Sequence, residues 1–210
     1  MSALLSAVDS DARADLDLFF AWRAGDRDAG LELVQRHHDA IYRFFDSKVR
    51  GDVQGLVTRT FRACLGVRHG LDGIERFRTL LFGAACTELH AHLEQVRRAE
   101  LTVPADPSSL SLEELGGSPV THGYEGEGVL ARALSRFPLE SQLLLELLLG
   151  EGLSLRELSY VMSQPLPQLV EHVSTASERL EAELLALGAN EDLRARVGAA
   201  LGERQEQARA

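Results

Sequence analysis

Apolar residues recur at three- and four-residue intervals in four successive segments of the first hundred residues. This spacing predicts amphipathic helices, each burying one face in a shared core. The predicted helices span residues 14–24, 27–49, 52–67 and 73–99. In the second of them, the expected core-facing residues are Leu31, Val34, His38, Ile41, Phe44 and Phe45.

The periodicity stops at residues 101–127, which contain three prolines and several glycines. Such a composition predicts a linker, in which we expect a single turn at residues 112–115. Four more helices are predicted within residues 128–187, so the fold class is all-α with two small helical domains, at residues 14–100 and 128–187. Residues 188–210 are polar and are expected to form a loose helix or a frayed tail.

Two local signals define the last helices of the second domain. Ser154 precedes an apolar run and Glu157 follows three residues later, the spacing of a capping box. After a turn around residues 164–167, the final helix places apolar residues at steps of three and four along one face. These positions are Leu169, Val173, Ala176, Leu180, Leu184 and Leu187. A short helix, a turn and a longer helix together form the pattern of a helix-turn-helix.

Composition limits the class of protein. The chain has 210 residues, of which 45% are hydrophobic and 26% charged, as in soluble globular proteins. We find no apolar run long enough for a transmembrane helix and no basic region preceding a signal sequence. The two cysteines, Cys64 and Cys86, are far apart in the sequence. These features predict a cytoplasmic protein with reduced thiols and no membrane association.

The negative charge is concentrated in the second domain. The whole chain has a net charge of −10, yet residues 1–100 are nearly neutral, with 14 Lys and Arg against 15 Asp and Glu. Residues 125–188 have 4 basic residues against 10 acidic ones, a net charge of −6. An acidic surface repels nucleic acid, so this domain is expected to meet DNA poorly unless its few cations are well placed.

Catalytic and metal-binding patterns are weak. We find no phosphate-binding glycine loop, no paired catalytic residues and no cofactor motif, so no enzyme activity and no cofactor are predicted. Cys86 and His90 are four residues apart on one helix and could contribute to a zinc site, but no second pair completes four ligands. A zinc-dependent or ligand-sensing helical domain therefore stays open as a third, weaker hypothesis.

Several segments together resemble a known family. Residues 52–65 ("DVQGLVTRTFRACL"), residues 74–98 ("IERFRTLLFGAACTELHAHLEQVRR") and residues 130–180 follow one another in the order found in extracytoplasmic-function sigma factors. These proteins are small promoter-specificity subunits of bacterial RNA polymerase. The likeness covers nearly all of residues 14–187. It implies an N-terminal sigma-type helical bundle and a C-terminal helix-turn-helix, and it implies core RNA polymerase and promoter DNA as partners.

The resemblance also implies roles for individual residues. Contact with the polymerase would fall on Leu56, Val57, Arg59, Thr60 and Phe61. Contact with the −10 promoter element would fall on Arg76, Phe77, Arg78, Thr79, Arg97 and Arg98. In the helix-turn-helix, the residues facing DNA or a protein partner would be Gln168, His172, Thr175 and Arg179.

The chain departs from the family pattern chiefly in its charges. In the polymerase-gripping segment, Gln54 and Gly55 replace an acidic pair, and at the −10 segment Leu80 replaces a tryptophan. In the last helix, residues 170–177 contain none of the family's usual lysines and arginines. Because each bonded phosphate contributes about 0.7 log units of affinity at roughly physiological salt, we do not expect this domain to bind DNA autonomously.

Two functions follow from the resemblance and the departures. One is a divergent sigma factor acting in promoter recognition and transcription initiation. The other is a degenerate sigma-like protein that no longer binds DNA and acts as a protein-interaction regulator, by binding polymerase or by competing with sigma or anti-sigma factors. The acidic second domain also makes an anti-sigma factor or another regulatory protein a candidate partner.

Overall fold

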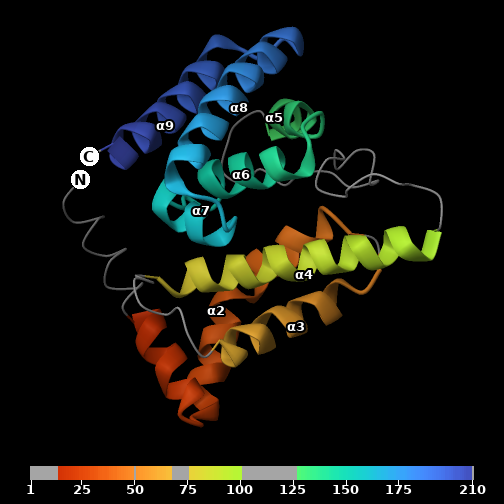
Figure 1. The fold of residues 1–210 in the computed structure, drawn as a ribbon, viewed down its shortest axis with the longest axis vertical. Helices are drawn as coiled ribbons and strands as arrows, with labels where there is room; N and C mark the ends of the chain where they lie inside the picture. Colours follow the sequence, from red (N-terminus) through yellow and green to blue (C-terminus); the bar gives the residue numbers. More distant parts are fainter. Residues whose placement is uncertain (1–13, 50, 68–75, 101–126, 210) are drawn as a thin grey trace.

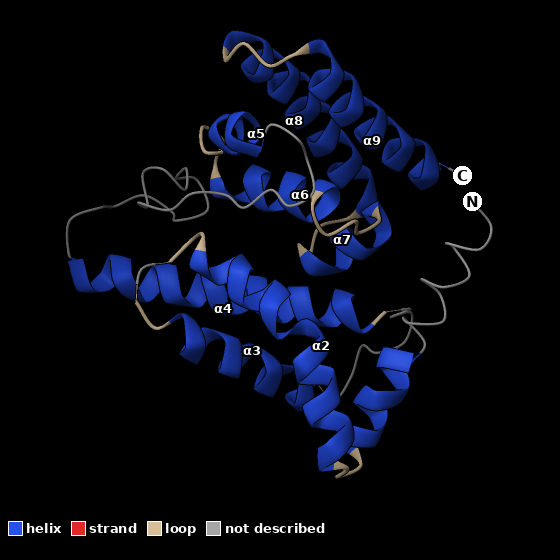
Figure 2. Ribbon diagram, turned by 180° about the vertical axis from the view of Figure 1, so that it is seen from behind, coloured by secondary structure: helices blue, strands red, loops and turns tan. Residues whose placement is uncertain are grey.

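The computed structural model describes residues 14–49, 51–67, 76–100 and 127–209. Every regular element within these ranges is an α-helix (Figures 1 and 2), which confirms the predicted all-α class. The predicted linker, with the turn expected at residues 112–115, falls outside these ranges except for its last residue.

The described residues of the N-terminal half form four helices around an aromatic core. They are a helix at residues 14–23, α2 (Arg27–Asp46), α3 (Val53–Gly66) and α4 (Phe77–Glu100). The side chain of Asp26 caps α2 by accepting hydrogen bonds from the backbone N–H groups of Asp28 and Ala29. The helix ends at Asp46, before the predicted end at residue 49, because the backbone turns at Ser47 and brings Lys48 to the interior.

The buried face of α2 differs from the predicted stripe. Leu31 is largely exposed and His38 is half-buried, whereas Leu33 and His37 are buried together with Ile41. Leu33, His37 and Ile41 are four residues apart, so they share one face of the helix. The sequence pattern did not decide which histidine is buried, because positions 37 and 38 are both histidine. The structure buries the one whose ring can bond to Asp15, with 2.7 Å between Nε2 and Oδ2.

The C-terminal half begins with four short to medium helices. They are α5 (Glu127–Leu134), α6 (Leu139–Leu149), α7 (Leu155–Val161) and α8 (Leu166–Ala186). The sequence of α6 is apolar on nearly all sides, and the helix is accordingly buried at the centre of this half. The capping box predicted at the start of α7 is present: Ser154 Oγ accepts from the Glu157 N–H at 3.2 Å, and the Glu157 carboxylate accepts from the Ser154 N–H at 2.8 Å.

Residues 188–210 were expected to form a loose helix or a frayed tail, and the structure places a docked helix there. They form α9 (Glu191–Arg209), which packs on α6, α7 and α8 (Figure 1). Leu193, Val197 and Leu201 are spaced four residues apart and are all buried, and Asn190 caps the helix by accepting from the Leu193 N–H at 2.8 Å. This narrow stripe in a mainly polar segment is enough to dock the helix, so the C-terminal half extends well beyond residue 187.

The two halves pack against each other through α4 and α7. In both views α4 lies between the N-terminal helices and the C-terminal half (Figures 1 and 2). A Cβ atom at Gly83 would lie 3.4 Å from Tyr160 Cε1 and 3.9 Å from Val161 Cα, so a small residue at this position lets α7 approach closely. Buried apolar side chains of both halves form one continuous core. Hereafter, "closed arrangement" denotes this packing of α4 on α7.

Candidate nucleic-acid and polymerase interface

The first turn of α4 holds three of the predicted −10 contacts, Arg76 lies directly before it, and Phe77 is fully buried. Phe77 packs inside the N-terminal half, with its ring centroid 5.2 Å from that of Phe19 and 5.4 Å from that of His37. The aromatic ring is therefore part of the core in this arrangement and is not available to stack on a base.

The neighbouring polar residues of this turn are bonded to acidic residues of the other half. Arg78 forms an ion pair with Glu151, and Arg76 Nε lies 3.8 Å from Glu157 Oε1. Thr79 Oγ1 donates to the same Glu157 oxygen at 2.8 Å. The predicted DNA contacts are thus brought together in space, but they face carboxylates of the C-terminal half.

Glu157 is fixed in position by its own helix. One carboxylate oxygen accepts hydrogen bonds from the backbone N–H and the hydroxyl of Ser154, at 2.8 and 2.9 Å. The other oxygen faces Thr79 of α4 and Arg76, which directly precedes that helix. The capping box that starts α7 therefore also orients a negative charge toward the N-terminal half.

A buried ion pair joins the halves beside this contact. Lys48 Nζ lies 2.6 Å from Glu146 Oε1, and the two side chains are 0% and 6% exposed. The ammonium group also donates to the Phe44 carbonyl at 2.9 Å and to Ser47 Oγ at 3.1 Å, and it lies 4.3 Å from the centroid of the Phe44 ring.

The environment of Glu146 is unfavourable for a charged carboxylate. Burial raises its pKa, and the nearby Lys48 charge acts in the opposite direction. Its second oxygen, Oε2, has no hydrogen-bond partner. This pair was not predicted from the sequence. A signal was present, because Glu146 has three leucines on each side in α6, and a charge buried among them needs a partner.

The predicted polymerase-contacting residues on α3 are mostly interior. Leu56, Val57, Thr60 and Phe61 are buried, and the Thr60 hydroxyl donates to the carbonyl of Leu56 at 2.9 Å. Arg59 is on the surface, where its Nε lies 3.1 Å from Glu88 of α4. Of this set, Arg59 alone presents its side chain to a partner in the closed arrangement.

Arg97 and Arg98 are the two cations predicted at the end of α4. Arg98 is exposed and pairs with Glu94 one turn earlier, at 2.6 Å. The side chain of Arg97 lies outside the described residues. Because such an exposed pair within one helix contributes little free energy, Arg98 can exchange Glu94 for a phosphate at small cost.

The outer face of α8 has the charge distribution that the sequence predicts. Gln168 and Thr175 are exposed, and Thr175 Oγ1 donates to the carbonyl of Glu171 in the same helix. His172 is half-buried, with its Nε2 2.9 Å from the hydroxyl oxygen of Ser141. Arg179 donates to the carbonyl of Arg136 at 2.7 Å, and its guanidinium carbon lies 4.5 Å from the centroid of the Phe137 ring. The single arginine of α8 is thus bonded to residues of the C-terminal half itself.

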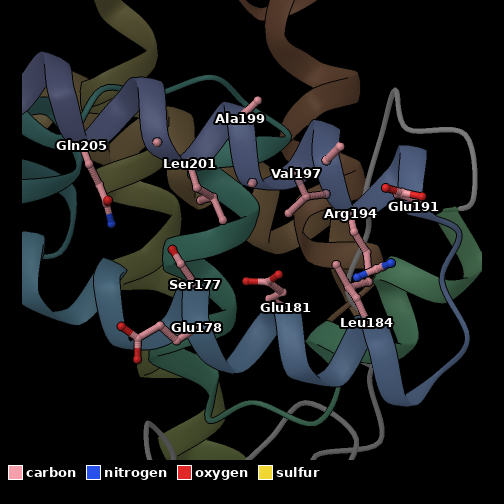
Figure 3. A pocket seen from close by; sticks show the side chains of 13 residues that line it. Ser177, Glu178, Glu181, Leu184, Glu191, Arg194, Val197, Ala199, Leu201 and Gln205 are labelled. Atoms are coloured by element: carbon pink, nitrogen blue, oxygen red, sulfur yellow. The ribbon is translucent and has the colours of Figure 1, made fainter.

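A shallow cavity of about 490 Å³ lies between α8 and α9 (Figure 3). Leu184, Val197 and Leu201 lie at its base, while Glu178 and Glu181 belong to the α8 side. The α9 helix therefore adds an acidic, partly apolar groove to the helix-turn-helix, which does not favour the approach of phosphate.

The weaker zinc hypothesis depends on Cys86, which lies in the interior of the protein. Cys86 is buried, and burial raises the pKa of its thiol to about 12, whereas a zinc ligand is a thiolate. Among the residues that the structure describes, no group of three or more His, Cys, Asp or Glu side chains is arranged to hold a metal ion. In the same part of the chain, no helix is long and apolar enough to cross a membrane.

Comparison with known proteins finds a likeness among solved structures. No protein-family model and no curated protein sequence matches the chain. Among solved structures, it is similar to that of CnrH in complex with the cytosolic domain of CnrY, with a TM-score of 0.55 and 22% sequence identity. The match covers 82% of this chain and 98% of that chain. CnrH is an extracytoplasmic-function sigma factor, and CnrY is an anti-sigma protein. The likeness shows a shared fold.

Proposed function

We propose that this chain is an RNA polymerase sigma factor-like protein that acts in promoter recognition and transcription initiation. The supporting observation is the fold: the likeness to CnrH covers 82% of this chain, which is more than either helical half alone. A shared fold alone does not define a function. The proposal therefore also rests on the cations retained at the start of α4, where the resemblance implies contacts with the −10 element.

The two halves have unequal roles in this proposal. Arg76, Arg78 and Thr79, with Arg97 and Arg98 at the other end of α4, supply the contacts with promoter DNA. The polymerase surface includes Arg59 on α3. The C-terminal half contributes little affinity for phosphate, because α8 has four glutamates and one arginine. Polymerase therefore supplies the affinity, while Gln168, His172 and Thr175 adjust promoter preference.

The same acidic face favours a second candidate function. Exposed Glu171 and Glu178 on α8, together with the engaged Arg179, suit contact with a basic protein surface better than contact with DNA. The chain would then bind polymerase, or a regulatory protein such as an anti-sigma factor, without recognising a promoter.

Transcription with purified core RNA polymerase and the upstream regions of the chain's own genome separates the two functions. A sigma factor gives defined start sites that depend on the added chain, and an Arg76→Ala/Arg78→Ala variant loses them. An Arg132→Ala variant, which changes an exposed arginine on α5, is the matched control and keeps them. Retention of the chain by core without any start site would overturn promoter recognition and support the second candidate.

A further inference from the structure

The cavity between α8 and α9, hereafter the α8–α9 groove, is lined by none of the residues assigned to contact with DNA or polymerase (Figure 3). We infer that this groove is a docking site for a basic amphipathic helix of another protein. The apolar side chains of that helix cover the base of the groove, and its lysines or arginines meet the acidic side. The inference goes beyond the proposed function, because it holds whether or not the chain recognises a promoter.

The α9 side of the groove is lined by small residues. They are Ala195, Gly198, Ala199 and Gly202, and a Cβ atom added at either glycine would meet no atom within 4 Å. Glycine destabilises a helix interior relative to alanine, and no close neighbour in the described part of the chain requires it at these positions. Small side chains let a second helix pack closely. Because Leu184, Val197 and Leu201 form an apolar base, the shallow groove suits the apolar face of such a helix.

The polar groups of the groove lack partners. Glu178 and Glu181 line it from α8, and within the described residues neither carboxylate forms an ion pair, whereas Glu183 outside the groove pairs with Arg136 at 2.8 Å. Figure 3 shows Glu181 between the two helices. The buried Nε of Arg194 has no hydrogen-bond partner in the same part of the chain, and it can donate to a backbone carbonyl of a bound segment. The groove therefore offers carboxylates for cations and a donor for a peptide backbone.

Charge disfavours the other occupants. A second copy would bring two acidic grooves together, and each chain has a net charge of −10. The segments of the chain outside the described ranges are not basic either: residues 1–13 contain two acidic residues and one basic, and residues 101–126 contain four acidic residues and no Lys or Arg. A basic segment of another protein is complementary to the groove.

The experiment titrates the full chain into a fluorescein-labelled peptide and follows its fluorescence anisotropy. The peptide consists of Leu and Lys, with the leucines along one helical face, and it has the length of α9, 19 residues. We expect saturable binding that weakens with added salt. A peptide of the same composition in shuffled order, which has no apolar face, should bind at least about tenfold more weakly.

Filling the groove should block the peptide. Gly198→Leu/Gly202→Leu places two side chains where both positions have room, and leucine favours a helix more than glycine does, so circular dichroism should show a folded chain. Peptide affinity should fall at least about tenfold, because the second helix can no longer approach. Gly66→Leu makes the same change at an open, exposed position of α3 and should bind as wild type.

Neutralising the groove gives a second test that leaves its shape unchanged. Glu178→Gln/Glu181→Gln should weaken binding by about two- to thirtyfold, since two exposed ion pairs are lost. Glu171→Gln/Glu203→Gln removes the same charge from exposed positions outside the groove and should weaken binding less.

Equal binding of the ordered and shuffled peptides, or an affinity that neither groove variant changes, would overturn the inference. Sedimentation equilibrium of the chain alone should give a monomer at tens of micromolar. A dimer that Gly198→Leu/Gly202→Leu dissociates would also overturn the inference, because a second copy would then be the occupant of the groove.

Discussion

Lys48 and Glu146 are 98 residues apart in the chain, yet their charged atoms lie 2.6 Å apart in the interior. The lysine follows the end of α2 and the glutamate lies in α6, so this contact joins the two halves beside the packing of α4 on α7. A buried ion pair adds little net stability compared with apolar residues of the same size. Its consequence is a specific packing, in which the acidic groups of α7 face the cations of α4.

The stability of variants at this pair tests that view. We expect Glu146→Leu to lower the free energy of unfolding by about 3–5 kcal/mol, since it leaves a buried charge unpaired. We expect Lys48→Met/Glu146→Leu to be at least as stable as wild type within about 1 kcal/mol, because no buried charge remains. Urea denaturation followed by circular dichroism measures both. Equal losses in the single and double variants would mean that the attraction between the charges dominates.

The remaining glutamate in Lys48→Met gives this variant a pH dependence. Without Lys48, burial alone raises the pKa of Glu146, so the folded chain holds a proton that the unfolded chain has lost. Between the two pKa values, stability falls as the pH rises. The stability lost in Lys48→Met is therefore smallest in acid and grows toward neutral pH, whereas the double variant lacks this trend.

A second titration concerns His37. Burial lowers its pKa despite the bonded Asp15, and the charges of Arg78 and Arg36 act in the same direction as burial. The unfolded chain therefore binds a proton at this histidine at a higher pH than the folded chain does. The stability that the neutral His37 contributes is fully present above about pH 6.5 and is lost progressively as the pH falls below that value.

Urea denaturation between about pH 5 and pH 7.5 measures the effect of His37. His37→Gln should have a flatter dependence of stability on pH than wild type. His38→Gln, which changes the neighbouring half-buried histidine, is the control and should keep the wild-type slope. Parallel pH profiles for wild type and His37→Gln would show that this histidine does not titrate differently on folding.

The sequence predicts elements better than it predicts contacts between them. Periodicity and the Ser154–Glu157 capping box gave the all-α class and the start of α7, because both are properties of a few neighbouring residues. The buried stripe of α2 was displaced, since Leu31 and His38 fit a helical period nearly as well as Leu33 and His37. No local pattern predicts that Glu146 meets Lys48 or that Glu151 meets Arg78, because these pairs depend on how two distant segments pack. The predicted contacts with polymerase and DNA stay predictions.

The packing of α9 gives a further prediction. Leu201 is buried between α9 and the rest of the C-terminal half, and its truncation leaves a cavity. Leu201→Ala should lower the free energy of unfolding by about 2–5 kcal/mol. Leu185→Ala removes the same atoms from an exposed position on α8 and should change stability by less than about 0.5 kcal/mol. Equal effects of the two substitutions would indicate that α9 is not docked in solution.

Charge substitution on α8 tests whether the acidic residues of this helix are the reason that the C-terminal half binds DNA weakly. Glu171→Lys/Glu178→Lys places two cations on exposed positions of the helix. If both reach phosphates of a labelled DNA duplex, the slope of log K against log salt becomes more negative by about 1.8. Glu171→Gln/Glu178→Gln removes the same acids without adding donors and should change the slope less. A steep slope already present in the wild-type chain, unaltered by Arg76→Ala/Arg78→Ala, would contradict weak phosphate binding by the C-terminal half.

Binding to core RNA polymerase tests the sigma-like function most directly. The measurement is the fluorescence anisotropy of the full chain, labelled at Ala186→Cys on the exposed end of α8, during titration with purified bacterial core enzyme. We expect saturable binding with a Kd below about 1 μM and displacement of the labelled chain by an unlabelled sigma factor. A folded chain whose anisotropy does not change at micromolar core enzyme would contradict the proposed function.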